Sequence, residues 1–181
     1  MHWTLADLVV DITQNAAEAG AGIVELQVSE NEKEFRFLVK DNGKGMTEEE
    51  LKRATDPFVT DGIKHPHRKV GLGLPFLIQT AEQSGGGWDI KSEKGKGTEV
   101  TAWFDTSNVD MPPLGDIPGM FRTIFMFNSE ADIIIRRKKQ KGGTENEYEI
   151  SKSELSEAIG GFEDVSNLMM LKEYLNSLEE E

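Results

Sequence analysis

The stretch DNGKGM, residues 41–46, places one carboxylate beside two glycines that are one residue apart, directly after a run of alternating apolar residues. Glycine has no side chain, so backbone amides in such a loop can come close to a ligand. A carboxylate in a glycine-lined pocket, here Asp41, is suited to accept a hydrogen bond from an amino group. We therefore expect a binding loop at the end of a β-strand, and the flanking sequence should supply the rest of a sheet.

The flanking sequence has the patterns of strands and helices in a mixed order. Apolar and polar residues alternate in four short runs, and apolar residues recur every three or four positions in longer ones. This order predicts an α/β (α+β) fold, a two-layer α/β sandwich with helices on one face of a mixed sheet. The predicted strands are 24–28, 35–39, 88–93 and 99–105, and the predicted helices are 5–19, 47–54 and 71–86.

The composition changes after Asp105, where TSNVDMPPLGDIPG contains three of the six prolines. We expect residues 1–105 to form the main domain, 106–119 a linker, and 120–181 a small C-terminal β-strand and helix extension. The extension contains the strand-like runs FRTIFMFN (121–128) and ADIIIRRKK (131–139), followed by helical spacing at 153–159 and 164–178. No function is predicted for this extension.

Charge and composition exclude several classes of function. The 181 residues carry a formal net charge of −13, which argues against general binding to nucleic acids or anionic membranes. Cysteine is absent, so disulfides and thiolate metal sites are excluded, and no apolar run approaches the ~20 residues that cross a bilayer. We therefore expect a cytoplasmic protein. One local exception is the stretch 62–81, which has no Asp or Glu but contains Lys64, Arg68 and Lys69.

Four short motifs occur in the order in which they would line one anion site. They are DITQNAAEA (11–19), DNGKGM, DPFVT with GLGLPF (56–60 and 71–76), and GKGT (95–98). A helix that starts just after Gly71 and Gly73 offers unpaired N–H groups to phosphate oxygens. The amide oxygen of Asn15 can bind a magnesium ion that bridges phosphates. Neither a GxxxxGK[ST] string nor the third glycine of a dinucleotide fingerprint is present, so those two phosphate cradles do not apply.

On these motifs the sequence resembles the GHKL ATPases, the superfamily of gyrases, heat-shock chaperones, histidine kinases and mismatch-repair proteins. The resemblance covers residues 3–105 and implies a two-layer α/β sandwich that binds ATP with magnesium. It implies Asn15 as the magnesium ligand and Asp41 as the acceptor of the adenine amine. The other residues that it assigns to the nucleotide are Gly43, Gly45, Phe58, Lys69, Gly71, Gly73, Leu74, Gly97 and Thr98. The basic loop between Thr60 and Gly71 would be a lid over the phosphates.

Asp11 lies one helical turn before Asn15, at the position where hydrolytic members of the superfamily usually have a glutamate. The resemblance implies that Asp11 is a general base for an attacking water, and that it works slowly because aspartate is one methylene shorter. The alternative is a solvated helix residue or one that orders water around magnesium. For Phe58, the alternative to a contact with the adenine is an ordinary aromatic residue of the hydrophobic core.

The sequence departs from the patterns of two branches of the superfamily. The mismatch-repair and gyrase proteins place a phosphate-sensing lysine on a large following domain, and the residues from Pro118 onward are too few for it. Sensor histidine kinases carry a phosphoacceptor histidine upstream of the motif around Asn15, and here only three residues precede the capped first helix. Two functions stay open. The first is an anti-sigma-like kinase that acts in trans on a histidine or serine of a protein partner. The second is a nucleotide-gated interaction module or slow ATPase. GLGLPF and the short lid favour the kinase, and a homodimer is a further candidate assembly.

Overall fold

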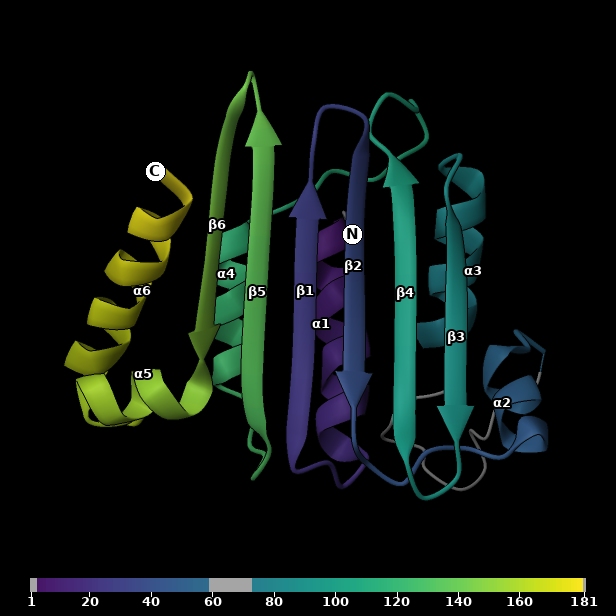
Figure 1. Ribbon diagram of the computed structural model, residues 1–181, viewed down its shortest axis with the longest axis horizontal. Helices are drawn as coiled ribbons and strands as arrows, with labels where there is room; N and C mark the ends of the chain where they lie inside the picture. The colour runs from purple at the N-terminus through teal and green to yellow at the C-terminus, as the bar shows by residue number, and fades with distance from the viewer. Residues whose placement is uncertain (1–2, 59–72, 181) are drawn as a thin grey trace.

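A computed structural model describes residues 3–58 and 73–180, and in this part of the chain six strands form one sheet in the order β3-β4-β2-β1-β5-β6 (Figure 1). The strands are β1 (Ile23–Glu30), β2 (Glu34–Asp41), β3 (Gly87–Glu93), β4 (Gly97–Asp105), β5 (Asp132–Lys141) and β6 (Thr144–Ser151). The helices are α1 (Leu5–Glu18), α2 (Glu48–Thr55), α3 (Gly73–Gln83), α4 (Ile117–Phe125), α5 (Lys152–Ile159) and α6 (Val165–Glu180).

The sheet is mixed, as the sequence predicts. β1 pairs in parallel with β5, whereas the other neighbouring strands are antiparallel. Helices α1, α3 and α4 lie behind the sheet on one face, and α5 and α6 lie beside its β6 edge (Figure 1). The expected two-layer arrangement is therefore confirmed. Because β5 and β6 extend the same sheet, the C-terminal segment shares strand pairing with the rest, and the division at residues 105 and 119 stays a prediction.

The predicted strand at 121–128 is wrong, because most of this segment belongs to helix α4. Asp116 caps the helix by accepting a hydrogen bond from the Gly119 N–H at 3.0 Å, and Pro118 stands in the first turn, where it has no N–H to lose. The buried residues recur at helical spacing: Ile117, Met120, Phe121, Ile124 and Phe125. Because FRTIFMFN is mostly apolar, the helical spacing of its buried residues does not stand out in the sequence. Strand β6 was not predicted because its residues are mostly polar and it lies at the edge of the sheet.

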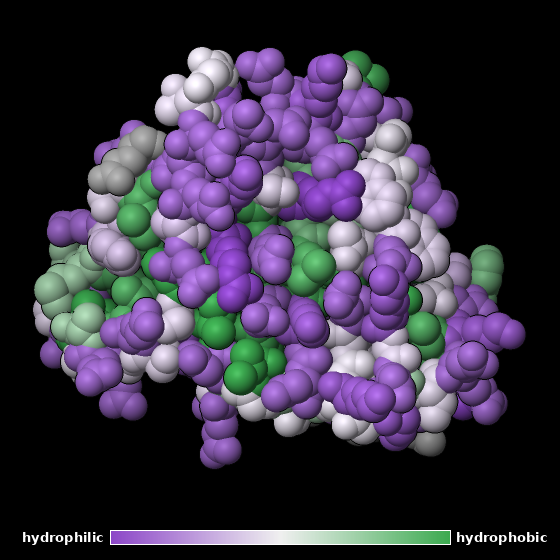
Figure 2. All heavy atoms as spheres, in the orientation of Figure 1, coloured by the Kyte–Doolittle hydropathy of each residue, from purple (hydrophilic) through white to green (hydrophobic). Residues whose placement is uncertain are grey.

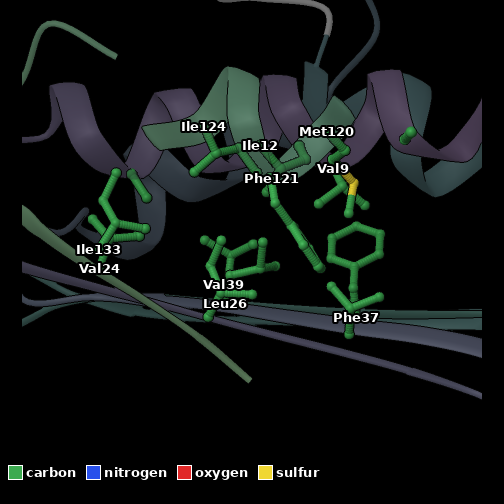
Figure 3. Close-up of a cluster of buried hydrophobic side chains, with 14 of the residues drawn as sticks. Val9, Ile12, Val24, Leu26, Phe37, Val39, Met120, Phe121, Ile124 and Ile133 are labelled. Atoms are coloured by element: carbon green, nitrogen blue, oxygen red, sulfur yellow. The ribbon is translucent and has the colours of Figure 1, made fainter. Parts of the chain in front are cut away.

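The hydrophobic core fills the space between the sheet and the helices. Figure 3 shows Val9 and Ile12 of α1 and the side chains of α4 pointing toward residues of β1, β2 and β5. The ring of Phe37 stacks on Phe104 of β4 with a centroid distance of 6.3 Å. Thr4 and Asp7 form a reciprocal capping box that fixes the start of α1 over this core. No helix within 3–58 or 73–180 is long and apolar enough to cross a membrane.

The other face of the sheet is mostly hydrophilic, with small hydrophobic areas between the charged side chains (Figure 2). The guanidinium of Arg36 lies 4.6 Å from the ring centroid of Trp103, a cation–π contact. A Cβ on Gly87 would come within 2.6 Å of the same ring, so the glycine gives the indole room to lie across β3. This aromatic residue is thus covered without a second layer of helices.

A buried arginine joins the C-terminal helix to the sheet. The side chain of Arg137 is 1% exposed and pairs with Glu30 of β1 at 2.7 Å and with Glu179 of α6 at 2.8 Å. Tyr148 donates its hydroxyl proton to Glu179 at 2.6 Å. Burial raises the pKa of Glu179, but the hydrogen bonds from Arg137 and Tyr148 outweigh it, and the net pKa is lowered. The cluster holds the last turns of α6 against β5 and β6.

We expect Arg137→Met to lower the free energy of unfolding by about 3–5 kcal/mol, because it removes the buried guanidinium that pairs with two half-buried carboxylates. Glu30 is left without that partner, and Glu179 with only the longer ion pair to Lys139. The matched control is Arg136→Met on the same strand, whose ion pairs are partly exposed to solvent and should contribute at most about 1 kcal/mol. Urea unfolding of both variants measures the difference. Equal losses for the two would contradict this account of the cluster.

Candidate functional site

Three polar side chains stand in a row across three neighbouring strands at one end of the sheet. Asp41 ends β2 and pairs with Thr98 of β4, and Thr98 pairs in turn with Ser92 of β3. Residues two apart on a strand share a face, so the row lies on the same side as buried Val39 and Val100, under the helices. The row therefore closes one end of the core at the point where the DNGKGM loop leaves the sheet.

Asp41 is a buried carboxylate, with 8% of its surface exposed. The N–H of Gly43 donates to its Oδ1 at 2.8 Å, and the backbone N–H of Thr98 also donates to the carboxylate. Burial raises the pKa of Asp41, and the two backbone hydrogen bonds oppose that rise without cancelling it. A buried acceptor that is held in place by backbone amides suits the amino group that the sequence analysis predicts.

The glycines around Asp41 are required by close approaches of the protein to itself. A Cβ on Gly43 would meet the carbonyl oxygen of Ala19 at the end of α1. Gly45 has φ +63° and faces the Glu93 carbonyl, and Gly97 has φ +127° and faces the Asp41 carbonyl. These glycines let the loop close tightly between α1 and the β3–β4 hairpin. Whether they also contact a ligand stays a prediction.

The motif around Asn15 lies beside the start of α3. The Nδ2 atom of Asn15 lies 3.4 Å from the position that a Cβ on Gly73 would take, so the half-buried amide meets the first residue of the helix. Asp11 is half-buried one turn earlier on α1, and Leu74 packs against the core. The first turn of α3 carries no acidic residue, which leaves its N-terminal end favourable for an anion.

One predicted residue is not joined to this cluster, and another part of the predicted site cannot be placed. Lys69, Gly71 and the predicted lid lie outside the described residues. Phe58 is 92% exposed and lines a groove between α2 and α3, and the lining of that groove includes none of the other predicted site residues. The groove marks a different place from the buried carboxylate. The lining of the groove contains no buried polar side chain, whereas Asp41 is a buried carboxylate, so we take the Asp41 cluster as the candidate site.

Sequence reasoning missed Ser92. Its hydroxyl accepts a hydrogen bond from the Met46 N–H at 2.8 Å and lies 2.8 Å from the hydroxyl of Thr98. The alternation of Trp88, Ile90 and Ser92 places this serine on the inner face of β3, and that alternation is the signal that could have singled it out. Asn42 was also overlooked; its side chain accepts from the Gly22 and Ile23 amides and fixes the entry to β1.

Comparison of the sequence with known proteins shows the family of this chain. A family model described as histidine kinase-, DNA gyrase B- and HSP90-like ATPase matches residues 3–108. The chain belongs to this family. The match includes Asp11, Asn15, Asp41, Gly73 and Thr98 within one domain, which supports ATP binding with a kinase-like function.

Among curated proteins, the sensor histidine kinase ZraS of Escherichia coli strain K12 is 27% identical over 113 residues, which cover 61% of this chain and 23% of that protein. Sporulation kinase C of Bacillus subtilis strain 168 is 32% identical over 96 residues, covering 52% and 22%. The sensor protein SrrB of Staphylococcus aureus strain NCTC 8325 is 36% identical over 77 residues, covering 41% and 13%. The chain thus spans about a quarter or less of the length of these relatives.

Two glycines in the turn between β3 and β4 allow a matched test of how closely the backbone at Gly97 approaches the Asp41 carbonyl. Gly95→Ala keeps open space around the new methyl group but strains a residue with φ +85°, and should cost about 1–2 kcal/mol of stability. Gly97→Ala adds a collision with the Asp41 carbonyl, so we expect a larger loss, about 3 kcal/mol or more. Thermal unfolding compares the two. A Gly97→Ala variant as stable as Gly95→Ala would show that the backbone approach is not tight.

Proposed function

We propose that the chain binds ATP with magnesium at the Asp41 cluster and passes the γ-phosphate to a histidine or serine on a separate protein partner. The observation that carries the proposal is a buried carboxylate held by two backbone amides at the end of a strand, in a chain of the ATPase family. The relatives named above include a sensor histidine kinase and a sporulation kinase, which supports phosphoryl transfer over other uses of the fold.

The row at the end of the sheet fits the base of the nucleotide. Asp41 would accept a hydrogen bond from the adenine amine, and Gly97 with Thr98 would complete this end of the pocket. Gly43 and Gly45 keep the loop close to the strands, so that no side chain stands between the base and Asp41. Phe58 would contact the adenine only if the segment after α2 brings it away from the groove that it now lines.

The start of α3 fits the phosphates. Gly73 and Leu74 begin the helix beside Asn15, and backbone N–H groups at a helix start favour anions. Lys69 and Gly71 would add charge and close backbone approach from the preceding segment. Asn15 would bind magnesium through its amide oxygen. The described residues contain no cluster of three or more acidic or histidine side chains that could hold a metal, so phosphate oxygens and water would supply the other ligands.

ATP supplies the phosphoryl group, and the residues of this chain would hold it in line with an acceptor. Asp11 lies one turn from Asn15 on the same side of α1, where a carboxylate can take a proton from an attacking hydroxyl, imidazole or water. We keep residues 1–105 as the ATP-binding unit, 106–119 as a linker and 120–181 as an extension. A protein partner that carries the phosphoacceptor completes the proposal, and a homodimer is compatible with it.

We expect Asp41→Asn to weaken ATP binding by about 1–3 kcal/mol, because a buried acceptor of the amine becomes a group that also donates. Asp89→Asn is the control, since that carboxylate lies on the other face of the sheet and is more than half exposed. Isothermal titration calorimetry with ATP measures both variants. If Asp41→Asn binds ATP as tightly as Asp89→Asn, Asp41 does not recognise the base.

Single-turnover incubation with γ-labelled ATP, with and without candidate partners from the same source, follows the phosphate. We expect label on a partner protein, slow release of free phosphate by the chain alone, and a loss of at least about tenfold in both rates for Asp11→Asn. Glu18→Gln, an exposed change on the same helix, should keep both rates. Release of free phosphate without any labelled protein would contradict the kinase and favour the slow ATPase.

A further inference from the structure

The hydroxyl of Ser92 ties together three segments of the proposed site. It accepts the Met46 N–H at 2.8 Å, lies 3.2 Å from the Gly97 carbonyl oxygen, and lies 2.8 Å from the Thr98 hydroxyl. Met46 ends the DNGKGM loop, and the Gly95 N–H makes a second tie to that loop at the Lys44 carbonyl, at 2.7 Å. The path of the loop that carries Asp41 is therefore set by the β3–β4 hairpin.

The numbers of donors and acceptors around Ser92 determine how the hydroxyls of Ser92 and Thr98 are oriented. A serine hydroxyl donates one hydrogen bond and accepts two. The Met46 N–H can only donate, so Ser92 accepts there, and the Gly97 carbonyl can only accept, so Ser92 donates there. The contact with Thr98 is then made only if Thr98 donates to Ser92. In this arrangement all three contacts of Ser92 are satisfied at once, and the proton of Thr98 is already committed.

We propose that Ser92 is a positioning residue that selects the base: it holds the proton of Thr98, so that Thr98 presents lone pairs beside Asp41. The inference rests on the proposed nucleotide site. Asp41 in its ionised form also only accepts hydrogen bonds, so the two neighbouring groups form an edge made of acceptors. Such an edge suits the exocyclic amine of adenine, which has two N–H groups, and repels the carbonyl oxygen that guanine carries at the same position.

Replacing Ser92 by alanine frees the Thr98 hydroxyl to turn its proton toward the base. We expect Ser92→Ala to bind GTP better relative to ATP, and the ratio of ATP to GTP affinity should fall by about fivefold to tenfold, the value of one hydrogen bond. Ser29→Ala on β1 is the control; that serine makes no side-chain hydrogen bond to any described residue, and it lies on the opposite face of the sheet. Calorimetric titration with each nucleotide gives the ratios.

Two further variants separate selection from a merely structural effect. Ser92→Thr keeps the hydroxyl on a strand and should restore the wild-type ratio. Thr98→Val removes the hydroxyl whose proton is held, so adding Ser92→Ala to it should change the ratio no further. If Ser92→Ala weakens ATP and GTP by the same factor, or if its effect persists in the Thr98→Val background, Ser92 acts only on stability and the inference is wrong.

A measurement without nucleotide keeps this inference distinguishable from the proposed function. Amide hydrogen exchange of Met46, followed by NMR in the free protein, should speed up in Ser92→Ala but not in Ser29→Ala, because only the former loses the acceptor of that N–H. Unchanged exchange would overturn the positioning role even where ATP binds as proposed. A wild-type chain that binds neither nucleotide would overturn the proposed function, and base selection by Ser92 with it, whatever the exchange shows.

Discussion

The site depends on keeping the carboxylate of Asp41 buried at the end of β2. A buried carboxylate is costly unless polar groups replace the water that it loses. Here the backbone amides of Gly43 and Thr98 do so, and both come from segments that reach Asp41 only through glycines with no room for a side chain. The requirement to satisfy one charge therefore accounts for glycine at positions 43 and 97 without invoking a ligand, and the proposed ligand would use a carboxylate already held in place.

Other contacts connect this loop to segments that are distant in the sequence. The loop after β2 packs on the last turn of α1, because the Lys44 N–H donates to the Ala19 carbonyl at 2.9 Å. The same helix carries Asn15, which meets the start of α3. Asp41 and Asn15 are thus joined through α1, so a change at either position is expected to affect the other through the helix. At the far edge, Arg137 ties α6 to the sheet by an independent cluster.

Much of the architecture could be predicted from the sequence, because α1 and the strands up to β4 have clear periods and caps. The prediction failed where hydrophobicity was uniform: FRTIFMFN reads as a strand, and only the caps and burial at Ile117, Met120 and Ile124 show a helix. It also failed for β6, whose polar edge residues carry little pattern. At the site, motifs point to Asp41 and Asn15. The alternation in β3 could place Ser92 on the inner face, but its position beside Thr98 depends on strand register, which is not visible in one sequence.

A crystal structure of the chain with magnesium and a non-hydrolysable ATP analogue tests the central claim most directly. The account predicts the adenine amine within hydrogen-bonding distance of Asp41, the phosphates at the start of α3, and magnesium on the amide oxygen of Asn15. An analogue bound instead in the groove between α2 and α3, with Asp41 making no contact to the base, would contradict it.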